Sequence, residues 1–176
     1  MLVNYEKHFA PVRHEPVVVI EAGLGGYAYS DRGGAGINTL RAYFSKARIH
    51  GFDIYPKPVA ENKTRGNIYV GSQNDESFIY RMIAETGNPD IFIDDASHIN
   101  PLTLRTFEIV YPLLNDGGLY CIEDLETSWW EDNDFYGCKD PEDYKAPTAI
   151  NLVRWLMNDL NKKHIPNFEA RYKVSE

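Results

Sequence analysis

The sequence predicts an open, mostly parallel α/β sheet with helices on both faces. The first observation behind this fold class is alternation: short apolar runs alternate with longer segments whose apolar residues recur at helical spacing, and glycines lie between them. The second is that runs such as residues 17–21 are apolar without polar alternation, which is typical of strands buried on both faces. The third is length, because 176 residues suit one domain and are too few for a (β/α)₈ barrel.

Five strands are expected in chain order, at residues 17–21, 48–55, 67–71, 90–94 and 119–122. Helices are expected between them: one from about residue 36 to 45, one from a cap at Asp75 to a stop at Gly87, and one from Asn100 to about 115. Pro147 opens a last helix, which carries apolar residues at helical spacing. In such a sheet, ligands bind at the carboxyl ends of the strands.

Composition excludes several functional classes. With 18 basic and 26 acidic residues, the net charge of −8 argues against a nucleic-acid partner and against a polybasic membrane surface. No apolar run is long enough to cross a bilayer, and the charged residues among the first 16 leave no signal-peptide core. Two cysteines, Cys121 and Cys138, cannot build a disulfide framework, so we expect a reduced, cytoplasmic location.

The first two predicted strands end in residues that suit a cofactor. Residues 21–26 read Glu-Ala-Gly-Leu-Gly-Gly, and glycines there let the backbone turn tightly and approach a ligand closely. The second strand ends at Asp53, whose carboxylate can accept hydrogen bonds from both hydroxyls of a ribose. Together they indicate an adenosine-containing cofactor, with NAD and S-adenosylmethionine both open. A ligand-free turn and a solvated strand end are the structural alternatives.

Acidic residues follow the fourth and fifth strands. Neighbouring parallel strands would bring Asp95, Glu123 and Asp124 to one edge of the sheet, where three carboxylates repel one another unless a cation lies among them. Oxygen ligands favour Mg²⁺, with Mn²⁺ and Ca²⁺ as alternatives. His98 follows Asp95 by three residues and could take a proton from a hydroxyl that a metal polarises. Acidic ends that point into water, and a histidine that caps the helix at Pro101, are the structural alternatives.

The order of these motifs resembles the class I S-adenosylmethionine-dependent methyltransferases, in particular the macrolide sugar O-methyltransferases of the mycinamicin and tylosin type. The resemblance covers about residues 17–130 and implies a Rossmann-like sheet. It also implies an enzyme of antibiotic biosynthesis that methylates a hydroxyl of a small molecule, a sugar of a natural product. The motifs that carry it are residues 21–27, Asp31-Arg32-Gly33-Gly34, residues 51–55, Gly71-Ser72-Gln73, Asp94-Asp95-Ala96-Ser97-His98 and residues 122–130.

The resemblance assigns roles to individual residues. It implies a Mg²⁺ site on Asp95, Glu123 and Asp124, and a general base at His98. Its implied partners are a hydroxyl acceptor such as a glycosylated natural product and further copies of the same chain, without nucleic acid or membrane. The cofactor, S-adenosylmethionine, would contact Glu21, Gly23, Gly25, Asp53, Ser72, Gln73 and Asp95.

Two departures from the family pattern are visible. Only residues 1–16 precede the first strand, as a lead-in, where the family carries a larger N-terminal region. Residues 17–176 form the cofactor-binding domain, whose carboxyl-terminal end looks incomplete because the last one or two strands of the sheet are not found. Residues 126–147, rich in aromatic and acidic residues, are expected to form a lid over the pocket.

Other functions remain open at this point. A cephalosporin-hydroxylase-like protein of the same fold could bind iron through His98 and two carboxylates. A non-catalytic module that binds only partners is a second alternative. An NAD-dependent oxidoreductase is the weakest, because the glycine turn lacks a G-x-G-x-x-G pattern.

Overall fold

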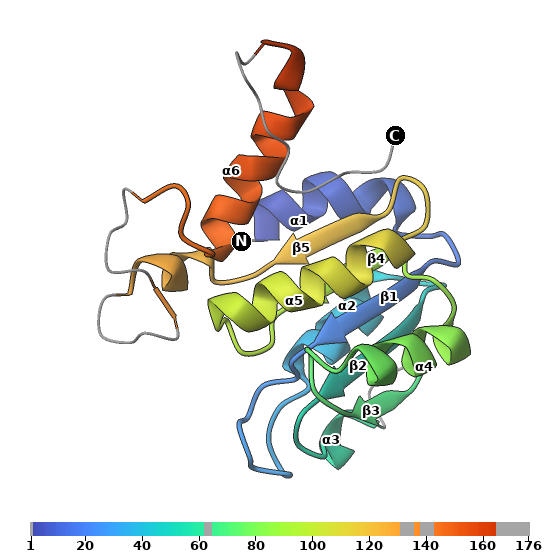
Figure 1. Cartoon of the computed structure of the whole chain (residues 1–176). Helices are drawn as coiled ribbons and strands as arrows, with labels where there is room; N and C mark the ends of the chain where they lie inside the picture. The colour runs from blue at the N-terminus through green and yellow to red at the C-terminus, as the bar shows by residue number, and fades with distance from the viewer. Residues whose placement is uncertain (1, 62–64, 131–135, 138–142, 165–176) are drawn as a thin grey trace. The chain divides into compact units, whose positions relative to one another are not determined.

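The computed structural model describes residues 2–61, 65–130, 136–137 and 143–164 (Figure 1). Its centre is a five-stranded sheet in the order β3-β2-β1-β4-β5, in which every pair of neighbours is parallel. The described residues group into two compact units, the first of residues 2–61, 65–97 and 105–123 and the second of residues 98–104, 124–130, 136–137 and 143–164. The strands are β1 Val18–Ala22, β2 Arg48–Asp53, β3 Ile68–Val70, β4 Ile91–Asp94 and β5 Leu119–Ile122.

The register brings the strand ends to one edge of the sheet. Ala22 of β1 pairs with Phe52 of β2 and with Asp94 of β4, and Asp94 pairs in turn with Ile122 of β5. The residues that follow these strands therefore leave the sheet from the same edge. The strand order reverses between β1 and β4, which is where this class of sheet forms its ligand crevice.

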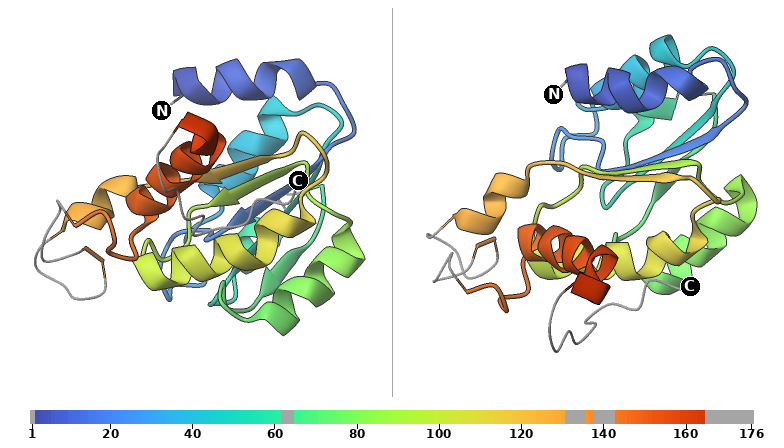
Figure 2. Two further views of the ribbon diagram at one scale, coloured as in Figure 1. Left: turned by 45° about the horizontal axis from the view of Figure 1, so that its top comes forward. Right: turned by 90° about the horizontal axis from the view of Figure 1, so that it is seen from above.

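Helices of the first unit cover both faces of the sheet, as the right-hand view of Figure 2 shows. On one face, α1 (Leu2–Phe9) and α2 (Ala35–Tyr43) pack on alternate strand residues such as Val19 and Ile49. On the other, α4 (Glu76–Thr86) and the part of α5 (Asn100–Val110) that belongs to this unit, residues 105–110, pack on Ile20 and Phe92. Since successive strand residues point to opposite faces, both sets must be apolar, which explains the unbroken apolar runs. Between β2 and β3 lies the short helix α3, Pro58–Glu61.

Local capping sets the ends of several helices. The Asp75 side chain accepts a hydrogen bond from the backbone N–H of Phe78 at 3.0 Å, which caps α4. Gly87 ends that helix with φ 86°, a conformation that costs glycine little. Both features agree with the sequence prediction.

The second unit is built around α6 (Ala149–Leu160) and the 3₁₀ helix η3 (Leu125–Trp129). Thr148 caps α6, one residue after the proline that was expected to open it. The Asn100 carboxamide oxygen accepts hydrogen bonds from Ser128 Oγ at 3.1 Å and from the backbone N–H of Ala149 at 2.5 Å. Asn100 therefore joins segments of this unit that are far apart in sequence.

The expected boundaries differ from the observed ones by a few residues. The third strand is three residues long instead of five, and the helix expected to reach residue 115 ends at Val110, followed by the 3₁₀ turn Tyr111–Leu113. The helix α1 within residues 1–16 was not predicted. Of the expected lid, residues 131–135 and 138–142 lie outside the described residues. Within the described part of the chain, no helix has the length and apolar character needed to span a membrane.

Candidate active site

A cavity of about 610 Å³ lies in the first unit, at the carboxyl ends of β1, β4 and β5 and against α1 and α2. We call it the acidic cavity, because three carboxylates, those of Glu21, Asp95 and Glu123, line it at the strand ends. Its walls are otherwise mostly apolar, and its volume is in the range of small-molecule sites. It is lined by Tyr5, Glu6, Phe9, Glu21, Gly36, Thr39, Leu40, Tyr43, Ile93, Asp95 and Glu123.

Glu21, the last acidic residue of β1, is the most unusual group in the acidic cavity. It is only 5% exposed, and its Oε2 has no hydrogen-bond partner among the described residues. Burial, and then the neighbouring charges of Asp95 and Glu123, raise its pKa from 4.5 to about 8. The carboxyl group therefore holds a proton near neutral pH unless positive charge lies beside it.

The end of β4 places two adjacent acids, Asp94 and Asp95, in different environments. Asp94 is buried, accepts a hydrogen bond from Tyr120 Oη at 3.2 Å, and has a pKa that burial raises to about 7. Asp95 follows the strand and lines the acidic cavity. The predicted site residue is thus the member of the pair that faces a ligand-sized space.

The Glu123 side chain is held by a residue that is distant from it in sequence. Tyr5 of α1 donates a hydrogen bond from its hydroxyl to Glu123 Oε1. Burial, followed by the hydrogen bond and charge of Glu123, raises the pKa of Tyr5. No motif pointed to Tyr5, because the contact joins positions 118 residues apart.

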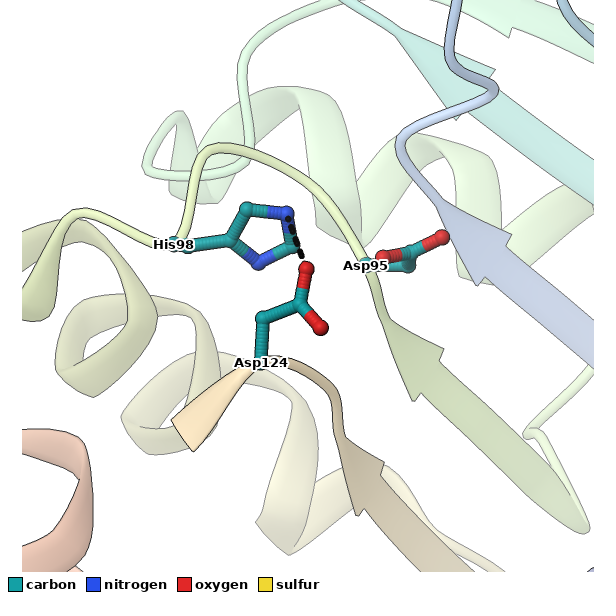
Figure 3. A group of neighbouring side chains, drawn as sticks. All are labelled: Asp95, His98 and Asp124. Carbon is teal, nitrogen blue, oxygen red and sulfur yellow. Dashed lines mark ion pairs between the residues drawn. The ribbon is translucent and has the colours of Figure 1, made fainter. Parts of the chain in front are cut away.

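His98 and Asp124 belong to the second unit, and Figure 3 draws them with Asp95. His98 Nε2 lies 3.5 Å from Asp124 Oδ2, and both residues have positive φ angles, 56° and 50°. The single O–H of Thr127 lies within donating distance of the backbone oxygens of His98 (3.1 Å) and Asp124 (2.9 Å), so Thr127 lies against both backbones.

Along the chain, Asp95 precedes His98 by three residues, and Glu123 is joined covalently to Asp124. Asp95, His98 and Asp124 each offer one atom that could ligate a metal ion. The capping role for His98 stays an alternative prediction, and its ring Nε2 lies beside the Asp124 carboxylate.

The glycine turn after β1 has the geometry of a close approach. Gly23 has φ 83°, and a Cβ there would lie 2.1 Å from the backbone oxygen of Asp95, so no other residue fits. Asp53 supports the turn: its Oδ2 accepts from the backbone N–H of Leu24 and its Oδ1 from that of Tyr55, both at 2.9 Å. Asp53 thus lies beside the predicted cofactor loop, as expected, and also holds it.

A buried lysine that the sequence did not single out supports the same turn. Lys57 is 1% exposed, and its Nζ donates to the backbone oxygens of Tyr27 and, at 3.1 Å, of Tyr29. These two carbonyls belong to the turn between β1 and α2. A lysine in a loop gives no local signal of such a role.

Ser72 and Gln73, the predicted adenine contacts, have different environments. Ser72 is partly exposed and its Oγ donates to Asn74 Oδ1 at 2.7 Å. The Gln73 side chain is buried, donates to Thr106 Oγ1 at 2.9 Å and accepts from the backbone N–H of Ser97 at 3.1 Å. Its amide group therefore ties the loop after β4 to α5, and an adenine contact stays a prediction for this pair.

The fold, a Rossmann-like open parallel sheet, is shared with a solved methyltransferase. More particularly, the chain resembles the sugar O-methyltransferases of natural-product pathways. A tetracenomycin rhamnosyl 3'-O-methyltransferase of Streptomyces olivaceus is 39% identical over 157 residues, which is 89% of this chain and 39% of that protein. The demethylmacrocin O-methyltransferase of Streptomyces fradiae is 37% identical over 96% of this chain and 42% of its own length. No family model matches the chain.

A solved structure shows the same fold. The MycE methyltransferase of mycinamycin biosynthesis, in complex with Mg, SAH and mycinamycin VI, superposes with a TM-score of 0.86 and 33% identity. The match covers 97% of this chain and 43% of that one. The chain therefore spans about two fifths of the length of these three proteins.

Proposed function

We propose that the protein is an S-adenosylmethionine-dependent, divalent-metal-assisted O-methyltransferase that acts on a sugar hydroxyl of a glycosylated natural product. The observation that carries the proposal is the acidic cavity at the carboxyl ends of β1, β4 and β5. The match to a methyltransferase solved with Mg, SAH and mycinamycin VI supports it. The acceptors in the names of the relatives, demethylmacrocin and mycinamicin VI, are the first compounds to test.

In this proposal the first unit binds the cofactor. Gly23 and Gly25 let the turn after β1 approach it, and Asp53 accepts hydrogen bonds from the ribose. Each Asp53 oxygen already accepts one backbone hydrogen bond, and a carboxylate oxygen has a further lone pair for a ribose hydroxyl. Glu21 and Asp95 face the positively charged methionine end, and Ser72 and Gln73 lie on the adenine side.

The residues present fit a hard divalent cation. Asp95, Glu123 and Asp124 offer carboxylate oxygens. The buried Oε2 of Glu21 has no hydrogen-bond partner among the described residues, and the described residues that line the cavity include no lysine, arginine or histidine. Mg²⁺ is the first choice, with Mn²⁺ and Ca²⁺ as alternatives. When bound, such an ion polarises a hydroxyl oxygen and orients it.

His98 accepts the proton that the sugar hydroxyl loses. Its Nε2 is 3.5 Å from the Asp124 carboxylate, so the charge that the ring gains lies next to an acid. Thr127 lies against the backbone of both residues, which helps to hold the base in place. We place the reaction in the cytoplasm, because cysteine usage fits a reducing compartment. We expect the protein to assemble as a homo-oligomer.

Calorimetric titration tests the cofactor. S-adenosylmethionine should bind with or without Mg²⁺, and NAD should not. Asp53→Ala should weaken cofactor binding at least several-fold, because a hydrogen bond to a charged group is worth about 1.5–3 kcal/mol. Asp75→Ala is the matched control, since it also removes a carboxylate that accepts a backbone N–H, at 3.0 Å, but at the cap of α4.

Two outcomes would contradict the proposal. Equal affinity in the Asp53 variant and the wild type would remove Asp53 from the cofactor site. NAD binding in place of S-adenosylmethionine would replace the proposed function with an oxidoreductase.

A further inference from the structure

The hydrogen bond from Tyr5 to Glu123 joins α1 to the edge of the sheet where the metal is proposed to bind. Tyr5 is held from behind: its ring stacks on Phe9, with 4.8 Å between ring centroids, and Phe9 packs on Phe44 at 5.5 Å. Phe9 and Phe44 are both core residues, 3% and 0% exposed. The Tyr5 ring is therefore held in place by core residues, and its hydroxyl lies at the acidic cavity.

We propose that Tyr5 is a positioning residue for the divalent cation: its hydroxyl holds the Glu123 carboxylate in the orientation that ligates the ion. This inference rests on the proposed function, because it takes Glu123 as a ligand. A carboxylate has two oxygens, so Oε1 can accept from Tyr5 while the other ligates.

The surroundings of Glu123 explain why such a donor is needed. Asp95 lines the same cavity, so a like charge faces Glu123 across it. A side chain in that position would turn away from the other acids unless something held it. A neutral phenol donates one hydrogen bond and adds no charge, so it orients the ligand without competing for the cation.

The alternative role for Tyr5 is purely structural, as part of the α1 packing. The two roles differ in what the hydroxyl does. Packing depends on the ring, which Tyr5→Phe keeps, whereas positioning depends on the oxygen, which the variant loses. Removing a group that orients a metal ligand costs about 10–100-fold in metal affinity.

The experiment measures binding of Mn²⁺ as a probe to the full chain by electron paramagnetic resonance of the free ion, without cofactor or acceptor. Tyr5→Phe should weaken Mn²⁺ binding about 10–100-fold. Tyr43→Phe is the matched control, since it removes a hydroxyl from the α2 wall of the same cavity, and its affinity should stay within about two-fold of the wild type. Thermal unfolding in a chelator shows whether either variant has lost packing.

Three results would overturn the inference. If the wild type binds Mn²⁺ and Tyr5→Phe binds it equally well, Tyr5 belongs to the packing alone and the metal site itself stands. Tighter binding in Tyr5→Phe would mean that the tyrosine competes with the cation. If the wild type binds no Mn²⁺, the proposed metal site fails, and the role of Tyr5 fails with it.

Discussion

Replacing Glu21 with glutamine should remove a pH dependence from the stability of the protein. The Glu21 carboxyl is buried, and its pKa is raised from 4.5 to about 8. Between these two values the folded state binds a proton that the unfolded state has released. Stability that depends on this proton is fully present below the unfolded pKa and is lost as the pH rises toward 8. The Gln variant carries no such proton.

The magnitude follows from the linkage relation. While one proton is taken up on folding, each pH unit changes the folding equilibrium about tenfold, so a rise from about pH 5.5 to about pH 7.5 should cost the wild type about 3 kcal/mol. This value is an upper bound, because it assumes that Glu21 is fully protonated when folded and fully ionised when unfolded over the whole interval. Glu21→Gln should lack that slope and be the more stable protein at the upper end.

Urea unfolding at several pH values, with a chelator present, measures the effect. The quantity of interest is the difference in unfolding free energy between wild type and variant, because other titrating groups largely cancel in it. Glu15→Gln makes the same substitution at an exposed glutamate and is the control. If the Glu21→Gln difference does not change with pH, Glu21 is ionised in the folded protein and the electrostatic reasoning is wrong.

Two further predictions concern loops of the site. Lys57→Met removes the donor that holds the backbone oxygens of Tyr27 and Tyr29. Urea unfolding should show a loss of about 1–3 kcal/mol in unfolding free energy, and calorimetry should show weaker S-adenosylmethionine binding. Unchanged cofactor affinity would mean that this turn is not part of the cofactor site. His98→Ala should keep cofactor and Mn²⁺ binding but lose about 10²–10⁴-fold in methyl transfer to demethylmacrocin or mycinamicin VI; near wild-type turnover would mean that the base is another group.

The sheet was predictable because each of its strands carries its own signal. Strands buried on both faces favour apolar residues at successive positions, and β1 and β4 are buried along their length. The helix α1 escaped prediction because its residues Leu2–Phe9 mix apolar and charged residues over barely two turns. Its stability comes from packing of Phe9 on the core, which is a tertiary contact.

Part of the candidate site was also predictable from the sequence, and part was not. Topology alone places Glu21, Asp95 and Glu123 at one edge, since each follows or ends a parallel strand, and the structure lines one cavity with all three. Topology could not have shown that Tyr5 reaches Glu123, or that the Gln73 amide makes hydrogen bonds with Thr106 and Ser97. These contacts join residues that are distant in sequence, so no local pattern encodes them.

The shape of the acidic cavity sets an electrostatic problem that the proposed function answers. Glu21, Asp95 and Glu123 cannot all be ionised at close range in a partly buried space without large repulsion. Burial first, and then the charges of Asp95 and Glu123, raise the pKa of Glu21, so its carboxyl retains a proton. Positive charge brought by a cation or by a sulfonium cofactor relieves the same repulsion. Either can then displace the proton, so ligand binding and deprotonation of Glu21 are linked. An arrangement that is unfavourable for an empty cavity becomes favourable for one that receives positive charge, which is why we assign these acids to binding and not to the stability of the fold.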